Sequence, residues 1–520
     1  SLYNPRPHRN PVGVKNRRNV VLGQMKKYNY LDEVLVDSLK QQPLNLNYTP
    51  ESHREGLATY FREFLRAHMK TWINNENNRK PDGSKYNLNT DGLKIYTTIN
   101  YTMQEMAENA VISHMPRLQK EFFEQNETLD DSIAPFRELT SGAVDTLLRI
   151  SMRRSERWRK MKYDLKKNDE EIEESFYIPK EMTVFSWAGE IDTTMTPLDS
   201  MKYYKSFFRP GMMSMDPTNG YIKAWVGGMN YRHFQYDMVK KGKRQIGSTF
   251  KPFVYAAAID QLKLSPCDTF PDSQFCIEKN KFGNVEQWCP KNSGDKYGRT
   301  RTLKNALANS VNTVTARLMD RIGPRTVVKL AKDLGIEQRI LPVPSIALGT
   351  PDLSVYEMVA AYSTFANKGV YTQPVFIERI DDKNGTTLYK NQPVTRDVLS
   401  EEAAYVTVNL LEGVTKAGSG TRLRTTGADE FNRAYQNVVT GYPYEFTNPI
   451  AGKTGTTQNQ SDGWFIGMVP NLVTGVWVGA EDRAIHFEDI AYGQGASMAL
   501  PIWGVYMKSV YQDSTLLISQ

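Results

Sequence analysis

The order of strand and helix patterns after about residue 207 limits the folds open to this chain. The run GMMSMDPTNGYIKAWVGG holds two alternating segments around DPTNG at 216–220, whose residue types favour a tight turn, so it predicts a β-hairpin. Helical patterns follow from Ser248 to Gly369, and strand patterns return in PIAGKTGTT, GWFIGMVP and LVTGVWVG before an apolar helix over about 496–511. Strands at both ends with helices between them predict an antiparallel sheet in an α+β fold.

The first 206 residues are mainly helical in pattern. Residues 1–50 show helical spacing of apolar side chains, whereas the segment that follows is polar and rich in Asn and Lys. LKIYTTI predicts a strand, TMQEMAENAVISHM predicts an amphipathic helix, and residues 116–185 are predicted to be charged and helical. A basic cluster over 149–167 precedes an acidic run over 169–174, and we interpret both as solvated faces of helices.

Composition is that of an ordinary globular protein with room for two or more domains. The 520 residues are 40% hydrophobic and 24% charged. No apolar run approaches the roughly 20 residues that span a bilayer, and the start SLYNPRPHRN is unlike a signal peptide, so we expect an ectodomain or a fragment. The net charge of +7 is mild for this length; it suits an anionic surface, and we expect no nucleic-acid partner.

The three cysteines form neither a disulfide framework nor a zinc site. Cys276 and Cys289 flank IEKNKFGNVEQW, a segment compatible with a hairpin, so both a bridge and two free thiols remain open. A bridge would contribute roughly 3 kcal/mol on the loop-entropy model and would indicate an oxidising compartment. Cys267 is predicted to be unpaired. No cluster of metal ligands is present, and we expect neither a metal nor a cofactor.

One segment, NPIAGKTGTTQNQSDGWFIG, contains the ending of a phosphate-binding loop. The complete loop has a glycine five residues before Gly452, where this chain has Thr447, and Pro449 lacks an N–H group to donate. The loop should also open a helix, but the following residues are polar and Trp464 begins a strand pattern. A nucleotide site is therefore excluded, and Lys453 needs another explanation.

Three short motifs together explain the presence of Lys453. RQIGSTFKPFVYAAAID places Ser248 and Lys251 three residues apart at the start of an apolar helix, so that both side chains share one face. The same spacing recurs in Ser293-Gly294-Asp295-Lys296, but no helix fixes the geometry there. Ser310-Val311-Asn312 and then Lys453-Thr454-Gly455 follow downstream. Ser-x-x-Lys, Ser-x-Asn and Lys-Thr-Gly in this order are a specific signal for serine acyl transfer.

The motifs resemble those of the class A penicillin-binding proteins, serine acyltransferases that cross-link peptidoglycan. The similarity extends over SMDPTNGYIKAWVGG, TLKNALANSVNTV, ALGTPDLSVYEMVAAYSTFANKGVY and IAGKTGTTQNQSDGWFIG. It implies a transpeptidase domain over 207–520, with an antiparallel sheet flanked by helices and an all-α subdomain, after a mainly helical linker region with a charged insert over 51–206. YNP and NRRNVVLGQM in 1–50 resemble the tail of a glycosyltransferase domain. The acidic catalytic motifs of that domain are absent from this sequence, so we expect no glycan polymerisation.

The physical chemistry of the motifs concerns the proton of Ser248. Lys251 accepts that proton only when neutral, and holding a lysine with a pKa of ~10.4 neutral at about pH 7 takes about 4.6 kcal/mol. A helix N-terminus supplies only about 0.3–1 kcal/mol. A second ammonium about 4 Å away supplies ~4 kcal/mol at an effective dielectric constant of about 20, and desolvation acts in the same direction. We therefore expect Lys453 to share the pocket with Lys251.

The resemblance implies a role for each remaining motif residue. Ser310 would relay a proton to the leaving amine, and Asn312 would bind the backbone of the donor peptide. Lys453-Thr454-Gly455 and Thr456 would form the strand along the substrate, with the two threonine hydroxyls suited to a terminal carboxylate. The backbone N–H groups of Ser248 and Thr456 would form the oxyanion hole.

The resulting hypothesis is a peptidoglycan D,D-transpeptidase that acts on D-Ala-D-Ala stem peptides, is acylated by β-lactams, and works in the periplasm on the outer face of the cytoplasmic membrane. Its anchor would lie outside this sequence, and other cell-wall synthesis proteins would be its partners. A D,D-carboxypeptidase and a penicillin-sensing module that binds wall peptides remain alternatives. A β-lactamase is disfavoured because Glu-x-x-Leu-Asn is absent and Val311 replaces the usual aspartate.

Overall fold

The computed structural model describes residues 11–44, 53–425 and 438–519, and the chain forms two compact units, residues 1–56 and 57–520. The first unit contains helices α1 (Pro11–Lys27) and α2 (Glu33–Gln41). Asp32 caps α2, because its side chain accepts a hydrogen bond from Leu35 N. Most apolar side chains of this unit are exposed, and Val36 is buried.

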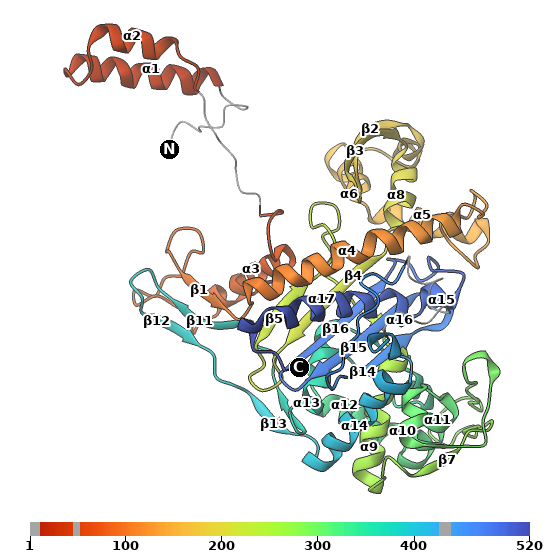
Figure 1. The fold of residues 1–520 in the computed structure, drawn as a ribbon. Helices are drawn as coiled ribbons and strands as arrows, with labels where there is room; N and C mark the ends of the chain where they lie inside the picture. Colours follow the sequence, from red (N-terminus) through yellow and green to blue (C-terminus); the bar gives the residue numbers. More distant parts are fainter. Residues whose placement is uncertain (1–10, 45–52, 426–437, 520) are drawn as a thin grey trace. The chain divides into compact units, whose positions relative to one another are not determined.

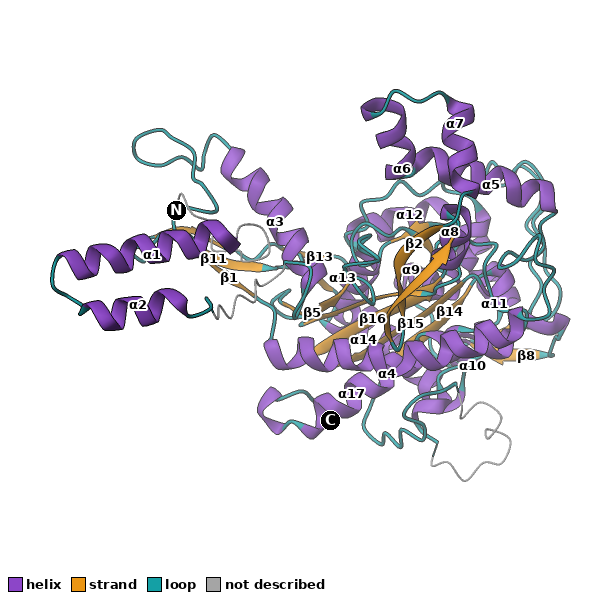
Figure 2. Cartoon of the chain, turned by 90° about the horizontal axis from the view of Figure 1, so that it is seen from above, coloured by secondary structure: helices purple, strands orange, loops and turns teal. Residues whose placement is uncertain are grey.

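A five-stranded antiparallel sheet forms the centre of the second unit. Its strand order is β14-β15-β16-β4-β5, and Figure 2 shows β14, β15 and β16 side by side. The strands are β4 (Arg209–Met215), β5 (Ile222–Val226), β14 (Ala451–Thr456), β15 (Asp462–Val469) and β16 (Leu472–Gly479). The predicted hairpin is β4–β5, and the last three strands pair with it through β16 and β4. The expected antiparallel sheet built from both ends of the region is confirmed.

Helices cover both faces of this sheet. On one face lie α4 (Tyr101–Asn126) and α17 (Leu500–Gln512), and on the other lie α13 (Val355–Ala366) and α14 (Glu401–Ala417) (Figure 1). Side chains of β15 alternate between the two cores, because successive residues of a strand point to opposite faces. The apolar, alternating strand sequences therefore produce three packed layers.

A helical region connects β5 to β14 and carries part of the candidate site. Its helices before α13 are α9 (Lys251–Leu262), α10 (Leu303–Ala308), α11 (Asn312–Ile322) and α12 (Pro324–Asp333). Helix α9 is apolar on all sides and is buried over residues 251–259, so it runs through the core. Short strand pairs accompany these helices: β6 (Arg244–Gln245) with β9 (Asp352–Leu353), and β7 (Thr269–Pro271) with β8 (Thr300–Thr302).

Residues 57–208 differ from the expected helical segment in two places, since 127–140 form turns between two helices and a hairpin follows later. Helices α3 (Thr59–Asn74), α5 (Ser141–Arg154), α6 (Glu156–Arg159), α7 (Asp169–Glu174) and α8 (Pro197–Lys205) are present, but β2 (Lys180–Ser186) and β3 (Gly189–Met195) form a hairpin. The helical prediction was wrong for 180–185, where the alternation of KEMTVF follows the period of a strand. The charged cluster pairs internally, for example through Arg149 and Glu173 at 3.2 Å.

The remaining strands join the start of the second unit to its middle. The predicted strand β1 (Lys94–Thr97) pairs with β11 (Ile377–Asp381), which also pairs with β12 (Thr387–Lys390). Strand β10 (Val370–Thr372) pairs with β13 (Thr395–Asp397). The short helices α15 (Ile490–Gly493) and α16 (Gly495–Met498) lead into α17, where an apolar helix was predicted.

Two properties of the described residues bear on the sequence predictions. A disulfide joins Cys276 to Cys289, and Cys267 is an exposed free thiol. Across residues 11–44, 53–425 and 438–519, we find no helix with both the length and the apolar character needed to traverse a bilayer.

Candidate active site

A short turn positions Ser248 at the entrance to α9. Residues Gly247–Phe250 form a 3₁₀ turn that runs directly into α9, and we call it the nucleophile turn because Ser248 is the predicted nucleophile. Ser248 and Lys251 therefore stand one turn apart on the same side. Gly247 has φ +53, a conformation that glycine adopts without steric cost, and its N–H group donates to Gly349 O at 3.0 Å. Ser248 is half-buried, whereas Lys251 is fully buried.

Strand β14 lies directly against this turn. A Cβ atom added to Gly247 would stand 2.8 Å from Thr456 O, and one added to Gly455 would stand 2.8 Å from Ile246 O. Only glycine permits so close an approach of the two backbones. The main chain at Thr456, predicted to donate to the oxyanion, therefore lies next to the nucleophile turn.

Ser310 lies between the two lysines. Its hydroxyl accepts hydrogen bonds from Lys251 Nζ at 3.0 Å and from Lys453 Nζ at 3.1 Å. Lys251 Nζ also donates to the main-chain oxygen of Ser310 and to Asn312 Oδ1, each at 2.5 Å. Ser310 has φ +56, a left-handed conformation that costs a non-glycine residue about 1–2 kcal/mol. The five side chains predicted to carry the chemistry come from the turn Gly247–Phe250, α9, the α10–α11 junction and β14, which meet here.

Both lysines are buried without a carboxylate partner. Lys251 and Lys453 have no exposed surface, and among the described residues neither forms an ion pair. Burial, followed by the charge of Lys453, lowers the pKa of Lys251 well below its usual value. Burial lowers the pKa of Lys453 to about 7. Desolvation therefore outweighs the repulsion between the two ammonium groups, which the sequence argument had put first.

The threonines of β14 meet a residue that the motifs did not identify. Thr454 Oγ1 shares a hydrogen bond of 2.5 Å with Ser419 Oγ, and Thr456 Oγ1 accepts from Gly495 N at 3.1 Å. Ser419 follows α14 in the loop AGSGT, where Gly418 packs against the main chain of Ala308. The only sequence signal for Ser419 is the pair of glycines around it, which permits close packing.

Ser293 and the aromatic residues Trp464 and Phe465 lie outside this cluster. Ser293 is in an exposed 3₁₀ turn, so the second Ser-x-x-Lys lacks a helical frame, as expected. Trp464 and Phe465 are buried in the cores on either face of the sheet. Trp464 Nε1 donates to Gln245 O at 2.8 Å, which anchors β15 to the strand that leads into the nucleophile turn.

Comparison with known proteins identifies the family. Residues 211–481 match the penicillin-binding protein transpeptidase domain, and residues 131–208 match the penicillin-binding protein middle domain. Penicillin-binding protein 1A of Aquifex aeolicus is 28% identical over 98% of this chain and 64% of its own length. Penicillin-binding protein 1A of Pseudomonas aeruginosa is 24% identical over 99% of this chain and 67% of its own length. The chain thus spans about two thirds of these relatives.

Solved structures show the same fold. Penicillin-binding protein 1A of Haemophilus influenzae has a TM-score of 0.65 at 21% identity, over 96% of this chain and 76% of its own. PonA1 of Mycobacterium tuberculosis, solved in complex with penicillin V, has a TM-score of 0.53 at 20% identity, over 87% of this chain and 92% of its own. With a family match over more than half of its length, this chain belongs to the penicillin-binding protein transpeptidases.

Proposed function

We propose that this chain is a peptidoglycan D,D-transpeptidase that forms an acyl-enzyme on Ser248. The observation that carries the proposal is the Ser310 hydroxyl held between two buried lysines beside the nucleophile turn. Such an arrangement provides a neutral amine as proton acceptor and a hydroxyl that can pass the proton on.

Acylation is proposed to begin when Ser248 Oγ attacks the carbonyl of the D-Ala-D-Ala bond. The hydroxyl proton passes to neutral Lys251, and a new C–O bond forms. The carbonyl oxygen becomes an oxyanion, which the N–H groups of Ser248 and Thr456 stabilise. The C–N bond then breaks, and the leaving D-alanine amine takes a proton from Lys251 through Ser310.

The substrate is proposed to lie along β14. The hydroxyl groups of Thr454 and Ser419 share a hydrogen bond, and Lys453 Nζ donates to the main-chain oxygen of Thr454 at 2.9 Å. The pKa of Lys453, about 7, leaves a substantial fraction protonated near neutral pH. Hydroxyl donors beside a cation suit the terminal carboxylate of a stem peptide. Asn312 is proposed to bind the backbone of the donor peptide.

Release of the acyl group is proposed to use an amine of a second stem, which makes a new amide and completes the cross-link. β-Lactams would acylate Ser248 through the same groups, as the penicillin complex of a structural neighbour suggests for the fold. The disulfide supports a location in an oxidising compartment, and we propose the periplasmic face of the cytoplasmic membrane.

The test is intact mass spectrometry after addition of penicillin to wild type and Ser248→Ala. We expect a stable adduct of one penicillin on the wild type and none on the variant, because the variant lacks the attacking oxygen. A D-Ala-D-Ala peptide is then followed with and without an acceptor amine. Amide product supports the transpeptidase, hydrolysis alone would assign a carboxypeptidase, and an adduct without peptide turnover would assign a sensor. Absence of any adduct on the wild type would contradict the proposal.

A further inference from the structure

The first turn of α11 is capped by a residue from a distant loop. Val311 occupies the N-cap position and has no side-chain group that can accept a hydrogen bond. Asn292 Oδ1 instead accepts from Asn312 N at 2.9 Å and from Thr313 N at 3.2 Å. These are two of the N–H groups that the start of a helix leaves without a partner. The main chain of Asn312 is thereby fixed by Asn292.

The residue before Asn292 fixes the side chain of Asn312. Asn312 Nδ2 donates to Lys291 O at 2.6 Å, and this contact turns Oδ1 toward Lys251 Nζ. An amide with its nitrogen held in this way presents an acceptor, and not a donor, to the lysine. Two consecutive loop residues thus determine how Asn312 meets Lys251.

A buried carboxylate anchors Asn292. Asn292 Nδ2 donates to Asp272 Oδ1 at 2.7 Å, and Thr313 Oγ1 donates to the same oxygen at 2.8 Å. Asp272 is fully buried and pairs through Oδ2 with Arg301 Nε at 2.7 Å. Burial raises the pKa of Asp272, but the hydrogen bonds from Arg301, Thr313 and Asn292 outweigh it and lower the pKa below its usual value. The anchor is therefore a charged acceptor.

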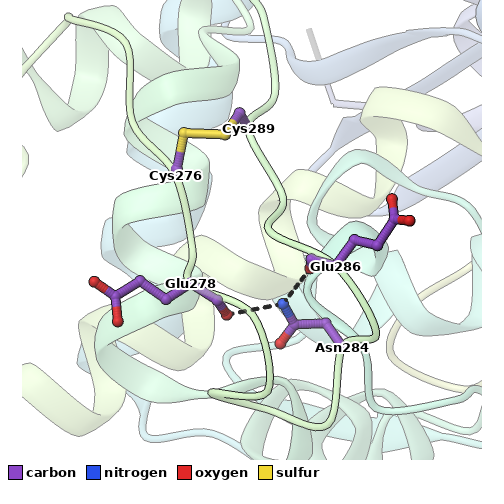
Figure 3. The surroundings of a disulfide bond; sticks show 5 residues. All are labelled: Cys276, Glu278, Asn284, Glu286 and Cys289. Carbon is purple, nitrogen blue, oxygen red and sulfur yellow. Dashed lines mark hydrogen bonds between the residues drawn. A yellow bond between two sulfur atoms is a disulfide. The ribbon is translucent and has the colours of Figure 1, made fainter.

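A disulfide closes the loop immediately before this pair of residues. Cys289, bonded to Cys276, precedes Lys291 by two residues (Figure 3). Inside the loop, Asn284 Nδ2 donates to Glu278 O at 2.9 Å and to Glu286 O at 2.7 Å. The loop keeps its own shape through these bonds, which do not involve α11.

We propose that Asn292 is a positioning residue for acylation, acting through Asn312 on the proton acceptor Lys251. The inference rests on the proposed function, because it assumes that Lys251 receives the serine proton. Loss of the Asn292 side chain leaves the main-chain N–H groups of Asn312 and Thr313 without their acceptor and loosens the first turn of α11. Asn312 Oδ1 then moves away from Lys251 Nζ, and water is expected to reach that nitrogen. Since desolvation is the largest cause of the low pKa of Lys251, that pKa rises and the neutral fraction falls.

The experiment measures the second-order rate constant of acylation by a fluorescent penicillin from about pH 5 to pH 9. Rates are divided by the folded fraction from circular dichroism. Asn292→Ala is expected to lower the rate constant by about 10- to 100-fold, as a small displacement of a catalytic group does. The acidic limb of the pH–rate profile of this variant is expected to move to higher pH. The double variant Asn292→Asp with Asp272→Asn restores a hydrogen-bonded pair with donor and acceptor exchanged, and it should recover part of the rate.

Asn284→Ala is the matched control, because it removes a loop amide with three main-chain hydrogen bonds, none of them to α11. It should keep the wild-type pH profile. A wild-type rate and profile in Asn292→Ala, even with a lower melting temperature, would overturn the inference. The same change in Asn284→Ala would also overturn it, by assigning the effect to general loosening of the loop. A wild type that penicillin does not acylate would instead refute the proposed function.

Discussion

The Ser310 oxygen accepts two hydrogen bonds from lysine nitrogens. A hydroxyl oxygen has two acceptor sites, so both are occupied and its own hydrogen is left to be donated elsewhere. A donor is what the departing amine of a cleaved peptide requires. The positive φ of Ser310 is consistent with this constraint, since strained backbone is often retained where a functional group must be held in place.

We predict that the free energy of unfolding rises with pH over the range in which Lys453 titrates. Burial lowers the pKa of Lys453 from 10.5 to about 7, so between these values the unfolded chain binds a proton that the folded chain does not. The free energy of unfolding therefore increases with pH, by about 2 kcal/mol from about pH 7 to pH 9. Denaturant titrations should show a larger increase in the wild type than in Lys453→Met, where buried Lys251 still contributes but Lys453 does not. Equal increases in the two proteins would contradict the low pKa.

The sequence predicted the motif residues of the site but not their supports. Ser248, Lys251 and Lys453 were identified because their residue types recur in a fixed order along the chain. Asn292 and Ser419 act through contacts with segments 20 and 35 residues away. A lone asparagine or serine in a polar loop has no local pattern that distinguishes it, so only the fold reveals these two residues.

Among the elements, the nucleophile turn and β14 approach each other closely through their main chains. The β14–β15 pairing places Gly455 opposite Trp464, whose indole is anchored to Gln245 O. Tyr362 of α13 donates to Thr249 O at 2.6 Å and holds the turn from the other side. The turn and β14 are therefore both tied to the packed core.

We predict that Gly455→Ala slows acylation by about tenfold or more, because its methyl group would push β14 away from Ile246 O and displace the N–H group of Thr456. Overpacking should also lower the free energy of unfolding by about 1–3 kcal/mol. Penicillin acylation rates and thermal melting measure the two effects. Gly142→Ala is the control, since a Cβ there meets nothing within 4 Å; an equal loss of rate in both variants would count against this account.

The prediction of elements succeeded where hydrophobic period and turn chemistry agreed, as in β4–β5 and β14–β16. It missed α14, because helical patterns were expected only as far as Gly369, with only strands from there until the C-terminal helix. EEAAYVTVNLLEGVTKA contains Val, Thr and Asn, which favour helices weakly, and tertiary burial of Leu410, Leu411 and Val414 decides the outcome. The N-cap Ser400 with two acidic residues after it was the signal available in the sequence.

For the molecule as a whole, the division into residues 1–56 and 57–520 places the candidate site entirely in the second unit. The core of that unit includes Ile277, inside the disulfide loop. The loop is therefore tied to the folding of the entire unit and not to a separate lobe. A crosslink within such a unit should affect its global stability.

We predict that the double variant Cys276→Ser with Cys289→Ser loses roughly 3 kcal/mol of unfolding free energy on the loop-entropy model, for a bridge across 13 residues. Equilibrium denaturation under non-reducing conditions measures the loss. Cys267→Ser, which removes the exposed free thiol, should unfold like the wild type. A double variant as stable as the wild type would contradict this prediction, since it would show that the bridge does not reduce the entropy of the unfolded chain as the model requires.

The backbone contact between Gly247 and Thr456 limits which substitutions could make this chain resistant to an inhibitor. Because two main chains meet there, a side chain at position 247 would stand 2.8 Å from Thr456 O, and the contact does not accommodate a larger residue. On the proposed function, substitutions that reduce acylation by an inhibitor are expected elsewhere, at Ser419 or in the loop of Asn292. Surveillance of resistant lineages should find their substitutions there.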